Sequence, residues 1–296
     1  MSVNLAPSEI ACPVCRSLRA RKPAVRLSYG AIGTCPDCGS GILEPRPSQQ
    51  ALSEIHGTEE YFNHPYFELR RDITPGIRRA LEARLDRIEA HTGQLTGKAL
   101  LDVGCDIGHF VEHAQSTRGA KTIGIDVSER AVESGRARGR DLRHGTLADV
   151  GLADGSIDVV CGFDVIEHVE DPRELVQEAA RVLKPKGFLA LETPNYGGLI
   201  YRIGRGLGGL PGIAGLITPL QERLWPRFHV QYFRETALRD LLNDAGFEAV
   251  HTELREFENA ELAVDNIVLR AGVQGVFLAS RLIGAPTLLC AFARKA

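Results

Sequence analysis

A glycine-containing turn near residue 104 carries residue types that can hold a nucleoside. The segment 100–110 reads LLDVGCDIGHF, so an apolar run leads through Gly104 and Gly108 into a helix-like pattern. A strand that ends in such a turn exposes main-chain amides at a helix N-terminus, where a ligand can approach closely. A second apolar run, TIGID, ends at Asp126, where an acid lies beside the ribose hydroxyls of a bound nucleoside. Together the two runs predict a nucleoside cofactor.

The order of acids and glycines indicates which nucleoside. The turn reads D-x-G-x-D-x-G from Asp102 to Gly108, unlike the G-x-G-x-x-G of dinucleotide sites. An acid two residues before the first glycine suits a cofactor with a positive ammonium group. Here the chain resembles the class I S-adenosylmethionine (SAM)-dependent methyltransferases, whose first motif is D/E-x-G-x-G-x-G. The resemblance covers 98–296 and continues in the blocks DGSIDVV, DVIEHVEDP, ARVLKPKGF and ETPN.

The resemblance implies cofactor contacts from the turn, the second strand and two later loops: Asp102, Gly104, Asp106, Gly108, Asp126, Thr146, Leu147 and Asp164. Gly104 and Gly108 would admit the methionine part of SAM, and Asp126 would hold the ribose. Thr146 stands where the family usually has an acid for adenine. The alternative for Asp126 is a surface acid that caps the helix starting near Ser128.

Asp106 departs from the family motif, because it replaces the middle glycine. We weigh three interpretations. It is a tolerated variant, because the position need not require a positive φ. Its carboxylate faces the ammonium of the cofactor or a substrate cation. Alternatively, it repels the carboxylate of the cofactor and weakens binding.

The segment DVIEH after the fourth expected strand holds candidate catalytic groups. It resembles the E-x-x-E-H cluster of ubiquinone-pathway O-methyltransferases, with Asp164 in place of the first Glu. Asp164, Glu167 and His168 could hold a divalent cation that orients a substrate hydroxyl. His168 is alternatively a general base, or Glu167 and His168 merely cap the helix 171–184. His229, which borders the acceptor site in similar proteins, is a second base candidate or a buried hydrogen-bonded histidine.

Four N-terminal cysteines have the spacing of a zinc ribbon. They form C-x2-C…C-x2-C: Cys12, Cys15, Cys35 and Cys38. Two such turns present four thiolates to one tetrahedral Zn²⁺, and the closed set of ligands makes the metal structural. The remaining cysteines read as small buried hydrophobes.

Composition limits the partners. The 296 residues have a net charge of −3, which argues against a large nucleic-acid footprint. We find no secretory signal and no apolar run long enough to span a membrane, so a soluble, cytoplasmic protein is expected. An RNA base methyltransferase that grips RNA through basic residues of the ribbon remains an alternative. So does a non-catalytic SAM-binding scaffold. The oligomeric state cannot be read from the sequence.

Alternating patterns predict an α/β, doubly wound, Rossmann-like methyltransferase sheet with a small zinc-ribbon module. We expect a zinc ribbon over 1–47, a helical linker over 48–95 and a methyltransferase domain over 96–296. Strands are expected at 98–103, 121–126, 141–144, 156–163, 187–193, 247–254 and 286–293. Helices are expected at 108–117, 128–138, 171–184, 235–245 and 264–283.

The apolar segment 197–225 is expected to cover the acceptor pocket as a lid, and to allow contact with a membrane surface. A dimer-forming or disordered flap fits the same composition. The sequence as a whole predicts methyl transfer from SAM to a small-molecule acceptor. A hydroxyl of a sugar, a lipid-linked saccharide or a natural product is favoured.

Overall fold

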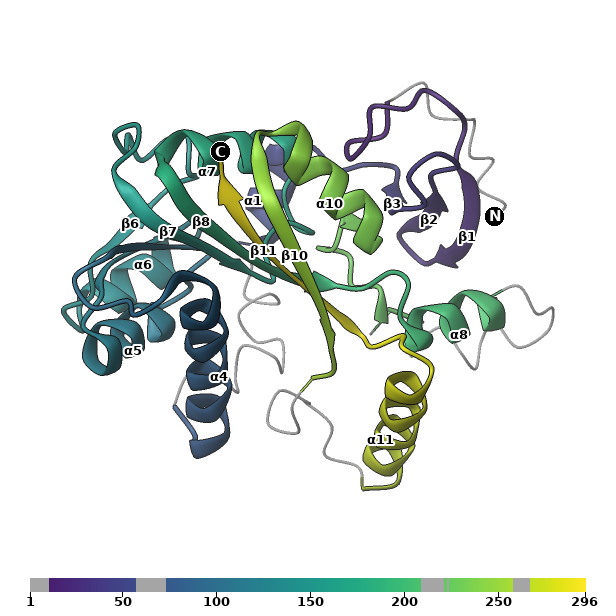
Figure 1. Ribbon diagram of the computed structural model, residues 1–296. Helices are drawn as coiled ribbons and strands as arrows, with labels where there is room; N and C mark the ends of the chain where they lie inside the picture. The colour runs from purple at the N-terminus through teal and green to yellow at the C-terminus, as the bar shows by residue number, and fades with distance from the viewer. Residues whose placement is uncertain (1–10, 57–72, 209–220, 223, 258–266) are drawn as a thin grey trace.

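The computed structural model describes residues 11–56, 73–208, 221–222, 224–257 and 267–296. Its centre is a seven-stranded sheet in the order β10-β11-β8-β7-β4-β5-β6 (Figure 1). The strands are β4 (Ala99–Val103), β5 (Lys121–Asp126), β6 (Leu142–His144), β7 (Ile157–Phe163), β8 (Leu183–Pro194), β10 (Phe247–Arg255) and β11 (Leu288–Lys295). Strands β4 to β8 run parallel, and β11 is antiparallel to both β8 and β10. The expected doubly wound sheet is confirmed.

Helices cover both faces of this sheet because neighbouring strand residues point to opposite sides. Leu100 packs in the core with α4 (Pro75–Thr92) and α5 (His109–Arg118), whereas Leu101 packs in the core with α7 (Pro172–Val182) and α10 (Glu235–Asp244). Helix α6 (Glu129–Arg136) packs near β5 and β6. The carboxyl ends of the parallel strands therefore remain available for a site.

A second, four-stranded sheet joins the N-terminal region to the rest of the molecule. Its order is β1-β2-β3-β9, with β1 (Lys22–Leu27), β2 (Gly30–Thr34) and β3 (Gly41–Glu44) from the cysteine-bearing region. Strand β9 (Gln231–Tyr232) comes from the expected methyltransferase domain and pairs antiparallel with Gly41 and Ile42. The ribbon sheet is thus completed by a distant part of the chain, which the sequence did not predict.

The linker and the lid are described in part. Helix α1 (Gln49–His56) and α4 fall within the expected linker, and 57–72 between them lie outside the described residues. Helix α8 (Leu199–Gly208) begins the expected lid, whereas 209–220 and 223 lie outside the description. Helix α11 (Ile267–Leu282) matches the expected 264–283 where it is described. None of the helices in the described ranges is both long and apolar enough to cross a bilayer.

Candidate functional site

The glycine turn lies where β4 gives way to α5. Gly104 and Gly108 have φ of 69° and 84°, in the left-handed region that favours glycine. A Cβ atom at Gly104 would lie 2.4 Å from Cγ2 of Val165, so this position excludes any side chain. The amides of Gly104 and Cys105 both donate to the carbonyl of Ile125, at 2.8 and 3.0 Å, which fixes the turn against β5. The predicted strand–turn–helix is therefore present.

Asp106 also adopts a left-handed conformation, with φ of 51°. The expectation that this position need not require a positive φ is therefore wrong, because the turn is left-handed at residues 104, 106 and 108. Aspartate tolerates this conformation better than most residues because its short polar side chain can bond locally. The amide of Asp106 donates to Oδ2 of Asp126 at 2.8 Å.

Asp126 ends β5 and faces the glycine turn. Its second oxygen, Oδ1, accepts from the amide of Ser128 at 2.8 Å. The side chain of Ser128, not that of Asp126, caps α6. Burial raises the pKa of Asp126 to about 6, although the two backbone donors act in the opposite direction. The carboxylate is thus held in place by both loops that would surround a nucleoside.

The residues expected at the adenine end have local roles. The hydroxyl of Thr146 donates to Oδ2 of Asp149 at 2.6 Å, and the Thr146 amide donates to the same oxygen. Leu147 is buried in the hydrophobic core. Any adenine contact here would therefore use the loop backbone or a shared Thr146 hydroxyl, whereas the Leu147 side chain serves packing.

Arg84, which was not predicted from the sequence, lies beside the candidate site. Its Nη2 lies 2.6 Å from Oε1 of the buried Glu192 and 3.3 Å from Oδ2 of Asp164. Arg255 Nε reaches the other oxygen of Glu192 at 2.7 Å. Burial opposes the charge of Glu192, yet Arg84 and Arg255 hold its pKa well below the usual range. A signal was present: Arg84 lies on the same stripe of α4 as Leu81 and Ile88.

Glu167, His168 and His229 converge after β7. Their candidate ligand atoms all lie within 4.8 Å of one another. His168 Nε2 is 3.9 Å from Oε1 of Glu167, and the two imidazole rings are 4.6 Å apart between centroids. Asp164 was expected as the third member of this cluster, but the gathered trio contains His229 instead, while Asp164 pairs with Arg84.

Glu167 is fully buried, and burial raises its pKa well above the usual range. Its Oε2 accepts from the hydroxyl of Thr193 at 2.9 Å, whereas Oε1 has no hydrogen-bond partner among the described residues. The interpretation that Glu167 and His168 cap the following helix is wrong, because Asp171 caps α7 through the amide of Arg173. Neither Glu167 nor His168 therefore serves as the N-cap of α7.

Aromatic residues form a wall beside the trio. Buried Tyr201 packs against both Tyr232 and Trp225, with ring centroids 5.7 and 5.9 Å apart. Glu167 contributes to the raised pKa values of both tyrosines, after burial itself, so the wall and the carboxyl group are electrostatic neighbours. Val25 and Ile32 of the N-terminal sheet belong to the same hydrophobic cluster. The N-terminal region thus helps to build this wall.

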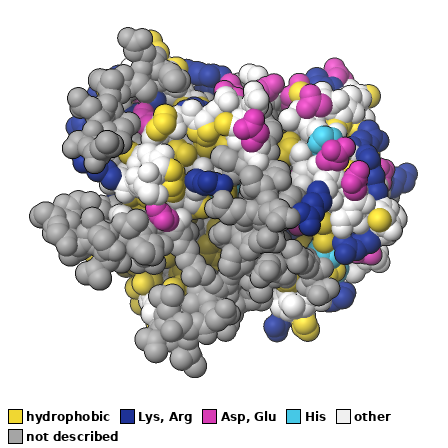
Figure 2. Space-filling model, turned by 180° about the vertical axis from the view of Figure 1, so that it is seen from behind, with side chains coloured by type: hydrophobic (Ala, Val, Ile, Leu, Met, Phe, Trp, Pro, Cys, Tyr) yellow, Lys and Arg dark blue, Asp and Glu magenta, His cyan; other side chains and the backbone are white. Residues whose placement is uncertain are grey.

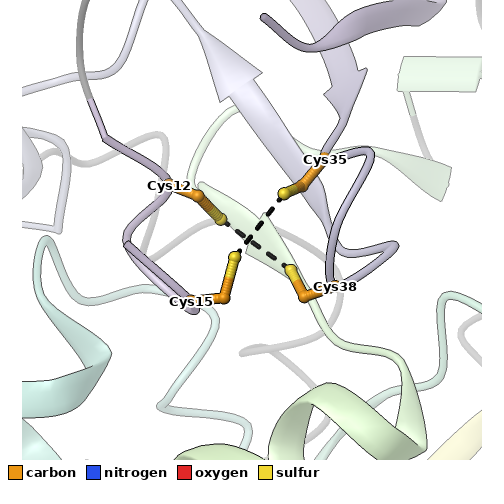
Figure 3. A group of neighbouring side chains, drawn as sticks. All are labelled: Cys12, Cys15, Cys35 and Cys38. Carbon is orange, nitrogen blue, oxygen red and sulfur yellow. Dashed lines mark hydrogen bonds between the residues drawn. The ribbon is translucent and has the colours of Figure 1, made fainter. Parts of the chain in front are cut away.

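Figure 3 shows the four predicted cysteines converging from two turns. The Sγ atoms of Cys12 and Cys38 are 3.9 Å apart, and those of Cys15 and Cys35 are 3.6 Å apart. Tetrahedral zinc with bonds of about 2.3 Å places its sulfur ligands about 3.8 Å from one another. The predicted four-cysteine cluster is present, and its donor set and spacing fit a closed zinc site.

Ion pairs attach the cysteine region to its surroundings and occupy much of its basic surface. Arg16 pairs with Asp171 of the α7 cap at 2.6 Å. Arg19 and Arg21 pair with acids of the ribbon itself, Asp37 at 2.5 Å and Glu44 at 2.6 Å. Arg173 of α7 donates to the carbonyl of Val14 at 3.0 Å. These pairs reduce the positive potential that the RNA-binding alternative requires.

A doubly wound sheet, with a glycine turn after its central strand and an acid at the end of the next, defines the Rossmann-like methyltransferase class. Residues 70–252 match a family model described as a methyltransferase domain. The chain belongs to this family of methyltransferase domains.

Individual similarities agree with this assignment. A probable S-adenosylmethionine-dependent methyltransferase of Mycolicibacterium smegmatis is 36% identical over 169 residues, which cover 56% of this chain and 58% of that protein. A ubiquinone biosynthesis O-methyltransferase of Idiomarina loihiensis is 39% identical over 119 residues, covering 38% and 49%. The chain thus spans about half the length of these relatives. The crystal structure of a SAM-dependent methyltransferase from Archaeoglobus fulgidus shares the fold, with a TM-score of 0.52, 22% identity and coverage of 74% and 94%.

Proposed function

We propose that the protein transfers a methyl group from SAM to a hydroxyl group of a small-molecule acceptor. The observation that carries the proposal is the placement of two different sets of side chains after adjacent strands. The left-handed turn and Asp126 follow β4 and β5, whereas Glu167 and His168 follow β7. Ligands of doubly wound sheets bind at this edge.

The first set would hold the cofactor. The bare backbone at Gly104 and Gly108 would admit the methionine part, while Asp102 biases the turn toward cations. Asp126 would accept hydrogen bonds from the ribose hydroxyls with the carboxylate lone pairs that the two backbone amides leave open. SAM, when bound, supplies an electrophilic methyl group on a positively charged sulfur.

The second set would act on the acceptor. His168 would accept the hydroxyl proton while the acceptor oxygen bonds to the methyl carbon and the carbon–sulfur bond breaks, leaving a neutral thioether. His229, with its ring centroid 4.6 Å from that of His168, is the second candidate base. The same trio with Glu167 could instead hold a divalent cation that orients the hydroxyl. Retention of activity with EDTA would favour the base.

The aromatic wall beside the trio supports an apolar class of acceptor. Tyr201, Tyr232 and Trp225 form an apolar, aromatic cluster beside the trio, and apolar surroundings favour a hydrophobic or lipid-linked acceptor, or an aromatic natural product. The similarity to ubiquinone biosynthesis O-methyltransferases supports a hydroxyl as the accepting group. A sugar hydroxyl remains within this class when the sugar is attached to an apolar carrier.

We further propose that Cys12, Cys15, Cys35 and Cys38 bind one structural Zn²⁺. No open ligand position is left for catalysis when four thiolates close the tetrahedron. A cytoplasmic location belongs to the same proposal, because free thiolates and zinc thiolate sites persist in a reducing compartment.

The proposal is tested by isothermal titration with SAM, followed by incubation with metabolite and lipid extracts. We expect SAM to bind and one class of extracted molecules to gain the mass of a methylene group. D126A should abolish SAM binding. D154A should leave it unchanged, because Asp154 is an exposed acid in the turn before β7. Absence of heat at millimolar SAM would refute the proposal.

A further inference from the structure

Helix α11 places large apolar side chains on the molecular surface. Leu278 and Leu282 are 60% and 80% exposed, and Ile283, just after the helix, is 58% exposed. Ala271 and Gly275 are exposed on the same stripe, at helical spacing from the two leucines. The apolar side of a helix normally packs on the protein core. An apolar side that faces solvent therefore indicates a surface that contacts another apolar partner or a membrane.

The opposite side of α11 is fixed to the protein, so the orientation of the stripe is set by the fold. Phe277 and Ser280 are buried, and the Ser280 hydroxyl bonds to the carboxyl group of Glu256. The amide of Thr287 donates to the other oxygen of Glu256 at 3.2 Å. The end of α11 is therefore tied to the end of β10 and the start of β11.

Helix α8 lies beside α11 and extends the same surface (Figure 1). The amide of Leu199 at the start of α8 donates to the carbonyl of Ala285 at 2.8 Å, which joins the two segments. Ile203 of α8 is 41% exposed. Tyr201, on the buried side of the same helix, belongs to the aromatic wall beside Glu167. The exposed surface and the candidate acceptor site thus share a helix.

The charges of these two helices have a single sign. Neither helix contains Asp or Glu, and the exposed charged side chains described on them are those of Arg202 and Arg281. Figure 2 shows a different pattern on the side where α4, α5 and α6 lie, because acidic and basic side chains alternate there. An apolar surface whose charges are all positive is complementary to a lipid bilayer with an apolar interior and negatively charged headgroups.

We propose that the α8–α11 surface docks onto an anionic lipid bilayer. The exposed leucines and isoleucines enter the boundary between headgroups and acyl chains, and Arg202 and Arg281 contact lipid phosphates. The attachment is interfacial, since α11 has 16 residues and the described helices include no membrane-spanning candidate. It would bring the aromatic wall close to a lipid-linked acceptor. The docking itself does not depend on methyl transfer.

Vesicle co-sedimentation of the full chain tests this proposal. We expect binding to phosphatidylglycerol-containing vesicles, weak binding to pure phosphatidylcholine, and a decrease with added salt. L278D/L282D should reduce binding at least about tenfold, because two charges enter the apolar boundary. L18D is the matched control, because Leu18 is 78% exposed but lies in the N-terminal region. R281Q should reduce binding about fivefold, whereas R138Q, in the turn after α6, should not.

Three outcomes would overturn the proposal. One is an absence of binding to anionic vesicles, and another is unchanged binding by L278D/L282D. The third is a dimer in light scattering that L278D/L282D converts to a monomer without vesicle binding, which would make a second copy the occupant. SAM titration of each variant keeps this test separate from the proposed activity, because loss of vesicle binding with normal SAM affinity concerns docking alone.

Discussion

At the scale of single residues, Asp106 gives the cofactor turn an unusual charge. Burial is the main cause of the raised pKa of Asp126; the Asp106 amide lowers that pKa by its hydrogen bond, and the Asp106 carboxylate raises it by its charge. Asp102 is buried in the adjacent strand β4. SAM carries positive charges on its sulfur and its amino group, so a turn with three acids should favour SAM over its neutral-sulfur product.

We predict that D106N weakens SAM binding about fivefold, the effect of removing roughly 1 kcal/mol of attraction at a solvated site. The product, S-adenosylhomocysteine, should lose less affinity. Asparagine tolerates the left-handed backbone that Asp106 adopts, so the fold should be unaffected. Calorimetric titration of both ligands measures the effect. Tighter SAM binding by D106N would instead show that Asp106 repels the cofactor carboxylate.

A second residue-scale prediction concerns pH. Because burial raises the pKa of Asp126 from 3.8 to about 6, the folded protein binds a proton here at pH values where the unfolded chain has released it. The contribution of Asp126 to the free energy of unfolding therefore falls as pH rises from about 4 to 6. The ionised form accepts more hydrogen bonds from ribose. We expect SAM affinity to increase severalfold between pH 5 and pH 7.

Calorimetry across this pH range is the measurement, with D126N as the comparison. Asparagine cannot ionise, so the increase should disappear in D126N even if its absolute affinity is lower. An equal pH dependence in D126N would assign the effect to another group, with His168 the first to examine.

At the scale of elements, the buried network around Glu192 joins α4 to the sheet. Arg84 comes from α4, Glu192 from β8, and Arg255 from the end of β10, while Asp164 follows β7. Arg84 also lies over the ring of Phe163, 4.7 Å from its centroid. Removing one member of such a network leaves a buried charge without full compensation.

R84A should therefore lower the free energy of unfolding by about 3–5 kcal/mol. R79A provides the control, because Arg79 is exposed on the same helix and its loss should change stability by only about 0.5 kcal/mol. Urea denaturation followed by circular dichroism compares the two variants. Equal stability of R84A and R79A would contradict a structural role for the network.

The elements that the sequence predicted well share a local cause. Strand β5 falls at the expected 121–126, and α5 and α10 begin within one residue of expectation, because apolar periodicity and turn residues mark them directly. Strand β9 has two residues and exists only because Gly41 and Ile42 supply its partner. Such an element has no periodic signal of its own. The trio with His229 was equally hidden, since 60 residues separate it from His168 and only the fold brings them together.

At the scale of the whole molecule, the cysteine cluster supports more than its own turns. Gly41 packs so closely on Tyr196 that a Cβ atom would lie 2.7 Å from the ring. The hydroxyl of Tyr196 lies 3.0 Å from that of Thr34, and Arg46 Nη2 donates to Oε1 of Gln231 at 2.8 Å. A loss of order around Cys12 and Cys35 should therefore reach β9 and His229.

We predict that one zinc ion co-purifies per chain and that its removal by a strong chelator lowers the thermal midpoint of unfolding. Acceptor turnover should decrease much more than SAM affinity, because β9 borders the trio whereas the glycine turn lies on other strands. C38S should behave like the chelated protein, and C161S, at a buried cysteine in β7, should keep its zinc. Equal losses of SAM binding and acceptor turnover would contradict the prediction that the ribbon supports the acceptor site and not the SAM site.

The pairing of β3 with β9 bears on how this protein relates to its family. The shared family model begins at residue 70, after the cysteine region has ended, yet part of the acceptor wall comes from Val25 and Ile32. Proteins that share only this region with the chain would have the elements that hold a methyl donor, but not the ribbon residues that pack beside the proposed acceptor site. If the proposed acceptor site is right, similarity over residues 70–252 reports on the use of the methyl donor, and the choice of acceptor should vary with the ribbon.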